Sequence, residues 1–224
     1  MKKLIGLSLI AIIQISPALA VAAPTAELKL VGDIRPSACY SKFITGSPID
    51  YGTLPASTLS ATEPTKLPVR IAGFSVNCEA AVKFGIRVHD ERSATTVTSL
   101  ETVPGYGAAE KLGLGAADNG ANIGAYSLEF LEGVVSIERL LSAKGSPLYS
   151  PDAGGNWVPY TAGGLKVDGG IYSIVEKGPA TAPKSYFSMA VYYNVHAVID
   201  KTDNLPITDE MKIDGLATFE VIYL

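Results

Sequence analysis

Two histidines are the residues that would first suggest catalysis in this sequence of 224 amino acids. A hydrolytic triad needs a nucleophile, a histidine within reach of it and an acid that orients the histidine. His89 stands at the end of one strand pattern, and His196 lies on the polar phase of another. That phase predicts a solvent-facing side chain for His196. Neither histidine therefore belongs to a catalytic constellation.

The carboxylates and glycines also lack the spacing that enzymatic chemistry needs. Asp90 and Glu91 are adjacent, so on a strand they would point to opposite faces and could not act as a pair. The sequence has no G-x-S-x-G motif, and Gly113-x-Gly115 does not continue into a phosphate-binding signature. The Asp118–Gly120 stretch is typical of a turn, with calcium binding as the alternative. We predict no catalytic residue, no metal site, no cofactor and no enzymatic activity.

The first 20 residues, MKKLIGLSLIAIIQISPALA, have the pattern of a secretory signal peptide. Lys2 and Lys3 provide the positive start, an apolar stretch follows, and a small-residue cleavage site ends at Ala20. Cleavage there is preferred to cleavage after Ala23, because a proline would directly follow Ala23. The sequence thus predicts a mature chain that is exported.

Export changes what the two cysteines imply. Cys39 and Cys78 would lie in an oxidising compartment, where a single pair is expected to form a disulfide. Closing a loop of roughly 40 residues would restrict the unfolded chain by about 4 kcal/mol. A zinc site would need four nitrogen or sulfur ligands, and only the two histidines remain to complete it.

Composition limits the classes of protein further. Apolar residues make up 47% of the sequence and charged residues 18%, which is not the balance of a disordered chain. The formal charge is −4, and removal of the signal with its two lysines leaves 204 residues at −6. An acidic chain without a long basic run lacks the cluster of positive charges with which proteins bind the phosphates of nucleic acid. After the signal, no uninterrupted apolar stretch approaches the length of a membrane span.

Two-residue alternation of apolar side chains recurs along the mature chain and predicts strands. The alternating segments are Ala26–Ile34, Val82–Val88, Phe187–Ile199 and Ala217–Tyr223. Turn dipeptides rich in Asp, Asn and Gly separate them, which favours an antiparallel β-sandwich. Leu128–Leu141 stays open between helix and strand, and Lys144–Gly164 has the composition of an insertion between strands.

Three features occur together in a fixed order. An alternating strand with a central glycine begins the mature chain, with Ala26, Leu28, Leu30, Gly32 and Ile34 on one face. The two cysteines follow, and an alternating strand runs to the end of the sequence with Tyr223 penultimate. This pattern resembles the subunits of chaperone–usher pili, the fimbrial pilins of Gram-negative bacteria, in a less-studied fimbrial-like branch. The resemblance covers roughly residues 25 to 90 and 185 to 224, and leaves the middle unassigned.

The resemblance implies an all-β fold: an incomplete immunoglobulin-like antiparallel β-sandwich that is completed by a donor strand. It divides the chain into a signal peptide (1–20), an N-terminal donor-strand extension (21–36) and a pilin domain (37–224). The predicted groove lies beside the C-terminal strand, at Ala217, Phe219, Val221 and Tyr223, and its free edge would need covering. The implied partners are a periplasmic pilus chaperone, an outer-membrane usher, neighbouring pilus subunits and a host or surface receptor. The implied location is a fimbrium on the cell surface, with a role in cell adhesion.

Two alternatives stay open from the residues themselves. The Ala26–Ile34 segment could be the first strand of a closed sandwich, which makes the protein a self-complete exported domain that binds a carbohydrate or protein ligand. Several aromatic residues in Gly- and Pro-rich stretches could stack on a sugar or could pack the ends of the sandwich. These are Tyr106, Tyr149, Trp157, Tyr160 and Tyr172.

Overall fold

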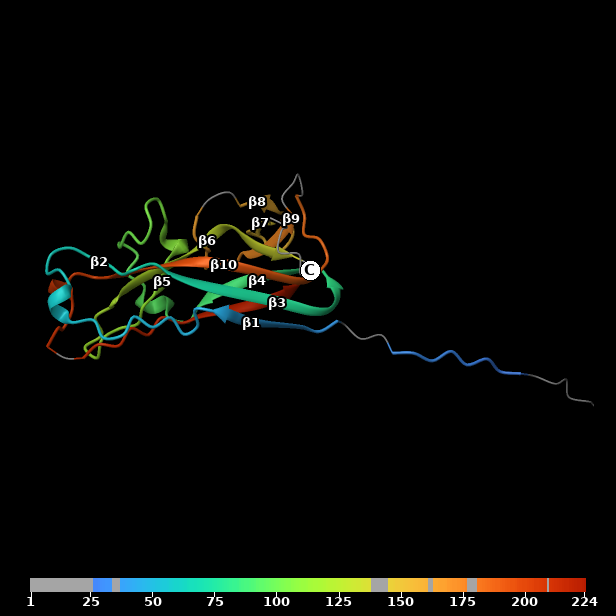
Figure 1. Ribbon diagram of the computed structural model, residues 1–224, viewed down its shortest axis with the longest axis horizontal. Helices are drawn as coiled ribbons and strands as arrows, with labels where there is room; N and C mark the ends of the chain where they lie inside the picture. The colour runs from blue at the N-terminus through green and yellow to red at the C-terminus, as the bar shows by residue number, and fades with distance from the viewer. Residues whose placement is uncertain (1–25, 34–36, 138–144, 161–162, 177–180, 209) are drawn as a thin grey trace, which may run out of the picture. The chain divides into compact units, whose positions relative to one another are not determined.

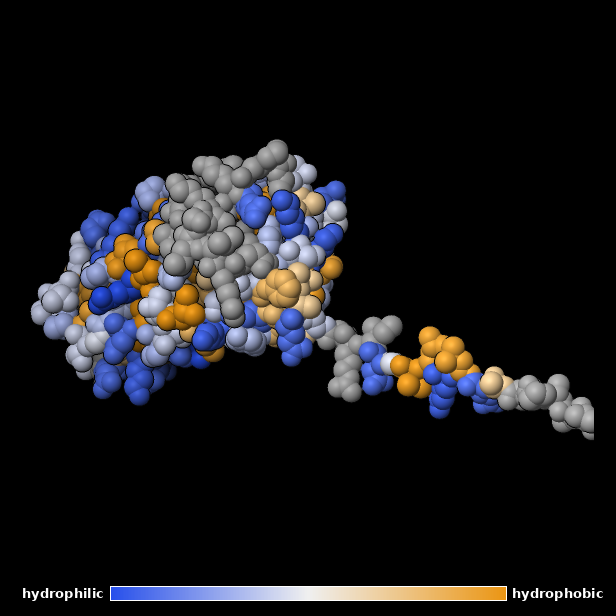
Figure 2. Space-filling view, turned by 45° about the vertical axis from the view of Figure 1, so that its right-hand side comes forward, coloured by the Kyte–Doolittle hydropathy of each residue, from blue (hydrophilic) through white to orange (hydrophobic). Residues whose placement is uncertain are grey.

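The computed structural model describes residues 26–33, 37–137, 145–160, 163–176, 181–208 and 210–224. They belong to two compact units, Met1–Arg35 and Pro36–Leu224. In the first unit, residues 26–33 form neither strand nor helix, and Figure 2 shows hydrophobic surface along this segment. Leu28 and Leu30 are 88% and 85% exposed. The predicted signal peptide and Ile34 lie outside the described residues.

The second unit is built from two antiparallel sheets (Figure 1). The first sheet has the order β1 (Cys39–Thr45), β3 (Arg70–Val82), β10 (Tyr186–Ile199), β6 (Gly124–Ile137) and β5 (Leu112–Gly113), with β2 (Thr65–Lys66) paired to β10. The second has the order β11 (Ala217–Tyr223), β4 (Phe84–Asp90), β9 (Ile171–Glu176), β7 (Gly145–Ser150) and β8 (Val158–Pro159). Short 3-10 turns occupy Ala56–Thr58, Ser93–Thr95, Ala108–Glu110 and Thr202–Asn204.

The alternating side chains of both sheets share one apolar core. In β10 every second residue from Met189 to Ala197 is buried, as its two-residue period predicts. Phe187, which the same period placed in the core, is 50% exposed, and Tyr186 is buried in its place. The cause is a shift in the register between β10 and β3 at Tyr186–Ser188, because an odd number of extra residues in one strand reverses the faces on the two sides of the irregularity.

The outer face of the first sheet is covered where β6 and β10 run side by side. His196 lies there opposite Ser127, which is fully buried and donates its hydroxyl proton to the carbonyl of Glu110. The prediction of a solvent-facing His196 is therefore wrong. Its side chain is only 20% exposed, and its Nε2 lies 2.9 Å from Oε2 of Glu129. The residues before β6 fold back over this face, which alternation within β10 cannot reveal.

The middle of the chain contributes strands and packed rings. The segment left open between helix and strand is β6 as far as Ile137, and residues 138–144 lie outside the described part. The predicted insertion Lys144–Gly164 contains β7 and β8, both paired into the second sheet. Tyr149 and Tyr172 are buried, and their ring centroids lie 5.0 Å apart. Tyr160 packs against both, so these three aromatics contribute to the core.

The predicted all-β, antiparallel fold is confirmed. Within the described residues, no helix is long and apolar enough to cross a membrane. The immunoglobulin-like topology and its completion by a donor strand stay predictions.

Candidate functional site

The C-terminal strand β11 is an edge strand whose free side has a definite register. The amide of Leu224 donates to the carbonyl of Lys83, and the amide of Glu91 donates to the carbonyl of Leu216. Because hydrogen bonding alternates along an antiparallel pair, the even-numbered residues of β11 bond to β4. The odd-numbered residues direct their N–H and C=O groups away from β4; they are Ala217, Phe219, Val221 and Tyr223.

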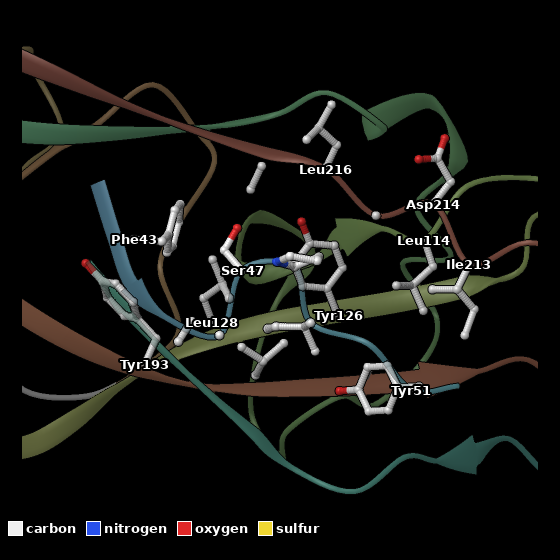
Figure 3. A pocket seen from close by; sticks show the side chains of 18 of the residues that line it. Phe43, Ser47, Tyr51, Leu114, Tyr126, Leu128, Tyr193, Ile213, Asp214 and Leu216 are labelled. Carbon is white, nitrogen blue, oxygen red and sulfur yellow. The ribbon is translucent and has the colours of Figure 1, made fainter. Parts of the chain in front are cut away.

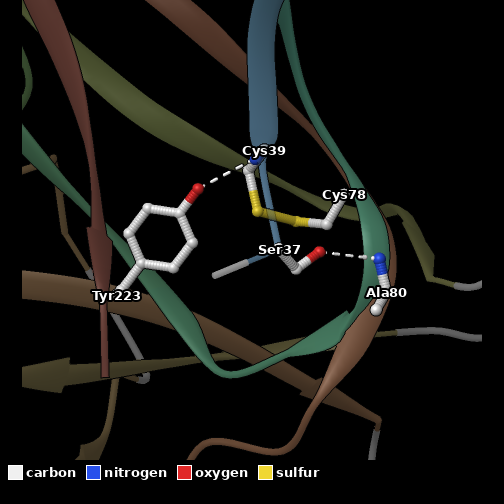
Figure 4. Close-up of a disulfide and its surroundings, with 5 residues drawn as sticks. All are labelled: Ser37, Cys39, Cys78, Ala80 and Tyr223. Atoms are coloured by element: carbon white, nitrogen blue, oxygen red, sulfur yellow. Dashed lines mark hydrogen bonds between the residues drawn. A yellow bond between two sulfur atoms is a disulfide. The ribbon is translucent and has the colours of Figure 1, made fainter. Parts of the chain in front are cut away.

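Strand β1 is the corresponding edge of the first sheet. The amide of Glu79 donates to the carbonyl of Ala38, so the even-numbered residues of β1 bond to β3. Cys39, Ser41 and Phe43 therefore direct their backbone groups away from β3. Cys39 also lies directly opposite Cys78, with 4.0 Å between the Cα atoms, and the two form the predicted disulfide (Figure 4). This covalent bond holds one end of β1 onto β3.

The two free edges meet through their side chains. The rings of Phe43 in β1 and Phe219 in β11 lie 5.1 Å apart between centroids, in an edge-to-face arrangement. Phe74 packs beneath both, at 5.4 Å from Phe43 and 4.9 Å from Phe219. Nearer the disulfide, the amide of Cys39 donates a 2.8 Å hydrogen bond to the hydroxyl of Tyr223. The outer edges of the two sheets thus border the same part of the core.

A groove opens beside the end of β1 at Thr45 and the start of β11 at Ala217. Its cavity holds about 340 Å³, and Figure 3 shows Phe43 and Tyr193 toward one end with Tyr51 and Ile213 toward the other. One wall is the turn after β1, at Gly46–Ile49, and the other is the approach to β11, at Ile213–Phe219. Buried side chains of β6 and β10 form the floor; they are Tyr126, Leu128, Tyr193, Val195 and Ala197.

The chemistry of the groove is apolar, with few polar groups. Asp214 is already paired with Arg92 at 2.7 Å. Burial raises the pKa of the Tyr126 and Tyr193 hydroxyls, which keeps both neutral. The hydroxyl oxygen of Tyr51 is buried and has no hydrogen-bond partner in the described residues. Such a surface suits apolar side chains of an extended peptide together with a polar backbone group that reaches Tyr51.

A larger cavity of about 660 Å³ continues past Tyr51. It shares Ile49, Tyr51 and Ile213 with the groove. Among the described residues, no group of three or more His, Cys, Asp or Glu side chains could hold a metal ion.

Charged residues hold the other side of β11 onto β4. Oε2 of Glu220 lies 2.9 Å from Nε2 of His89 and 3.3 Å from the guanidinium of Arg87. The hydrogen bond from His89, helped by the charge of Arg87, lowers the pKa of Glu220 below its usual value of 4.5. These contacts leave the groove edge of β11 free.

We predict that Glu220 contributes a pH-dependent part of the stability. A carboxyl whose pKa is lowered by folding stabilises the protein above the unfolded pKa, and this stability is lost as the pH falls through the folded pKa. The difference in unfolding free energy between the native protein and Glu220→Gln should shrink between about pH 5 and pH 3. Urea unfolding over this range measures it, with the exposed Glu79→Gln as control. A difference that does not change with pH would contradict the assignment.

The predicted site residues are distributed over both units. The described donor residues Ala26, Leu28, Leu30 and Gly32 are exposed in the first unit, while the predicted strand Ala217–Tyr223 is β11 in the second. The opposite wall of the groove was not predicted from the sequence. The signal that could have indicated it is the alternation that places Phe43 on the same face of β1 as Cys39. The floor in β6 and β10 was not predicted either, because nothing in those strands indicates which core residues border an opening.

Comparisons with known proteins found one family match and one similar protein. Residues 28–127 match a family described as proteins of unknown function (DUF1120), and this match includes both cysteines but ends before β11. The chain is also similar to Protein GltF from Escherichia coli (strain K12), with 23% identity over 226 residues that cover 88% of each chain. Neither name states a function or mentions a pilus. Together with the disulfide, which is typical of oxidising compartments, these findings support an all-β protein of an exported type.

Proposed function

We propose that this protein is a structural subunit that polymerises by strand exchange. The groove between β1 and β11 takes up residues 26–34 of a neighbouring copy as an added strand. The assembled product is a pilus or fimbria on the cell surface that supports cell adhesion. The observation that carries the proposal is the pair of free strand edges bordering one apolar groove.

The exposed N-terminal segment has the complementary pattern. Leu28 and Leu30 share one phase of the alternating pattern, and burial in the groove would contribute about 1.5–3 kcal/mol for each of these exposed side chains before ordering costs. Gly32 lacks a side chain and suits the part of the groove where the rings of Phe43 and Phe219 approach to 5.1 Å between centroids. The outward N–H and C=O groups of β11 supply backbone hydrogen bonds for an added strand.

An open strand edge is also an aggregation risk before assembly. A periplasmic chaperone covers the groove until the subunit reaches an outer-membrane usher, where the segment of the next subunit replaces it. This sequence of partners rests on the resemblance to pilins, and no cofactor takes part.

A peptide-binding experiment tests the proposal. The mature protein without residues 21–33 is mixed with a synthetic peptide of residues 25–36. At a hundredfold excess over Kd, binding should raise the melting temperature by roughly 5–10 °C. The control peptide carries aspartate in place of Leu28 and Leu30, and it should leave the melting temperature unchanged.

Two outcomes would contradict strand uptake. One is a melting temperature that neither peptide changes, and the other is an equal rise with both peptides. Either outcome would favour the self-complete domain that binds a carbohydrate or protein ligand.

A further inference from the structure

We propose that Tyr223 is a latch that joins the free edges of β1 and β11 beyond the groove in the free subunit and slows the completion of strand uptake. This inference rests on the proposed function. It concerns the hydrogen bond from the Cys39 amide to the Tyr223 hydroxyl, which is 2.8 Å long and joins the two free edges directly (Figure 4).

The β1 side of this bond is held firmly in place. Cys39 is bonded to Cys78, and the carbonyl of the preceding Ala38 accepts from the amide of Glu79. One residue earlier, the hydroxyl of Ser37 accepts a 2.8 Å hydrogen bond from the amide of Ala80. These three contacts hold the backbone around Cys39 onto β3. The Cys39 N–H, which faces away from β3, therefore cannot move aside for an added strand unless these contacts break.

The Tyr223 side is the movable one. Its side chain is 53% exposed, and its backbone is on the phase of β11 that faces away from β4. Rotation of this side chain breaks the hydrogen bond without disturbing the pairing of β11 with β4. A strand that lies between the two edges cannot coexist with a hydroxyl that joins them. The Tyr223 side chain must therefore leave Cys39 before the added strand is fully seated.

The latch lies at one end of β11, whereas the groove opens at the other end, beside Ile213–Ala217. The first contact of an incoming segment with the open groove does not require the latch to move. Loss of the hydroxyl should therefore accelerate the seating step and leave the first binding step unchanged. A net hydrogen bond of ordinary strength corresponds to an acceleration of about two- to tenfold.

Stopped-flow measurements with a fluorescent peptide of residues 25–36, in excess over the monomeric mature protein, test this inference. For Tyr223→Phe, the limiting rate at saturating peptide should rise about two- to tenfold, while the second-order rate at low peptide should stay unchanged. Tyr40→Phe is the matched control, because Tyr40 is in β1 on the opposite phase and is 62% exposed. It removes a hydroxyl without touching the groove.

A second measurement does not depend on peptide uptake. Hydrogen exchange at the Cys39 amide should be slower in the native protein than in Tyr223→Phe, and Tyr40→Phe should match the native protein. Equal exchange in all three proteins, or equal limiting rates with measurable uptake, would overturn the latch and leave strand exchange standing. Absence of peptide uptake in all three would overturn strand exchange, and the latch with it.

Discussion

Replacement of Leu30 by aspartate is expected to abolish polymerisation of the mature protein while its folded domain and its binding to the chaperone stay intact. The Leu30 side chain is 85% exposed in the free chain and would be buried in the groove of a neighbouring copy. A carboxylate cannot enter an apolar groove without losing its hydration. The residues that line the groove include no cation, and the charged one among them, Asp214, is itself an acid that is paired with Arg92. We expect polymer to disappear from size-exclusion profiles, with an unchanged melting temperature for the monomer.

The adjacent residue provides a matched control. Val31 is 81% exposed, carries a similar apolar side chain and lies on the opposite phase of the segment. Val31→Asp introduces the same charge but directs it to solvent in a seated strand, so polymerisation should continue. Deletion of residues 21–33 should match Leu30→Asp. Normal polymerisation of either the deletion or Leu30→Asp would refute strand donation, whereas loss in both point variants would point to a general charge effect.

Removal of the disulfide is expected to lower the unfolding free energy by about 4 kcal/mol. Cys39 and Cys78 are 39 residues apart in the sequence, so their bond restricts a long loop of the unfolded chain. The variant Cys39→Ala/Cys78→Ala removes the bond and keeps small apolar side chains at both half-buried positions. Guanidinium unfolding of the oxidised native protein and the double variant measures the difference.

Chemical reduction separates the cross-link from the side chains themselves. The native protein in excess reductant should unfold at the same denaturant concentration as the double variant does without reductant. The double variant itself should not respond to reductant. If the oxidised and reduced native proteins were equally stable, the cross-link would not contribute to the stability of the fold. The position of the Cys39 amide, which donates to Tyr223, would then depend on the other contacts of β1 and not on the disulfide.

Local patterns in the sequence predicted much of the framework. The two-residue periods of β10 and β11 follow from which side chains prefer the core, and each period is visible within one segment. The pairing of Cys39 with Cys78 followed from export and from the presence of two cysteines. In each case the information lies within one segment or in the number of cysteines.

Other features depend on neighbours far away in the sequence. The exposure of Phe187 results from the register between β10 and β3, and the burial of His196 results from the chain that covers its sheet. Strands β7 and β8 come from a segment rich in Gly and Pro, where pairing to β9 and to each other organises the backbone. None of these partners can be recognised from the segment alone.

By itself, the sequence determined that this protein is all-β, that its cysteines are bonded and that an apolar, alternating segment precedes them. Only the tertiary structure decided which two strand edges border the groove, because strand order joins residues as far apart as Phe43 and Phe219. It also decided that Tyr223 reaches the Cys39 amide, since a hydrogen bond across 184 residues has no local signature. Hydrophobic periodicity sets the face that each strand buries, whereas the packing of the two sheets sets which edges stay open.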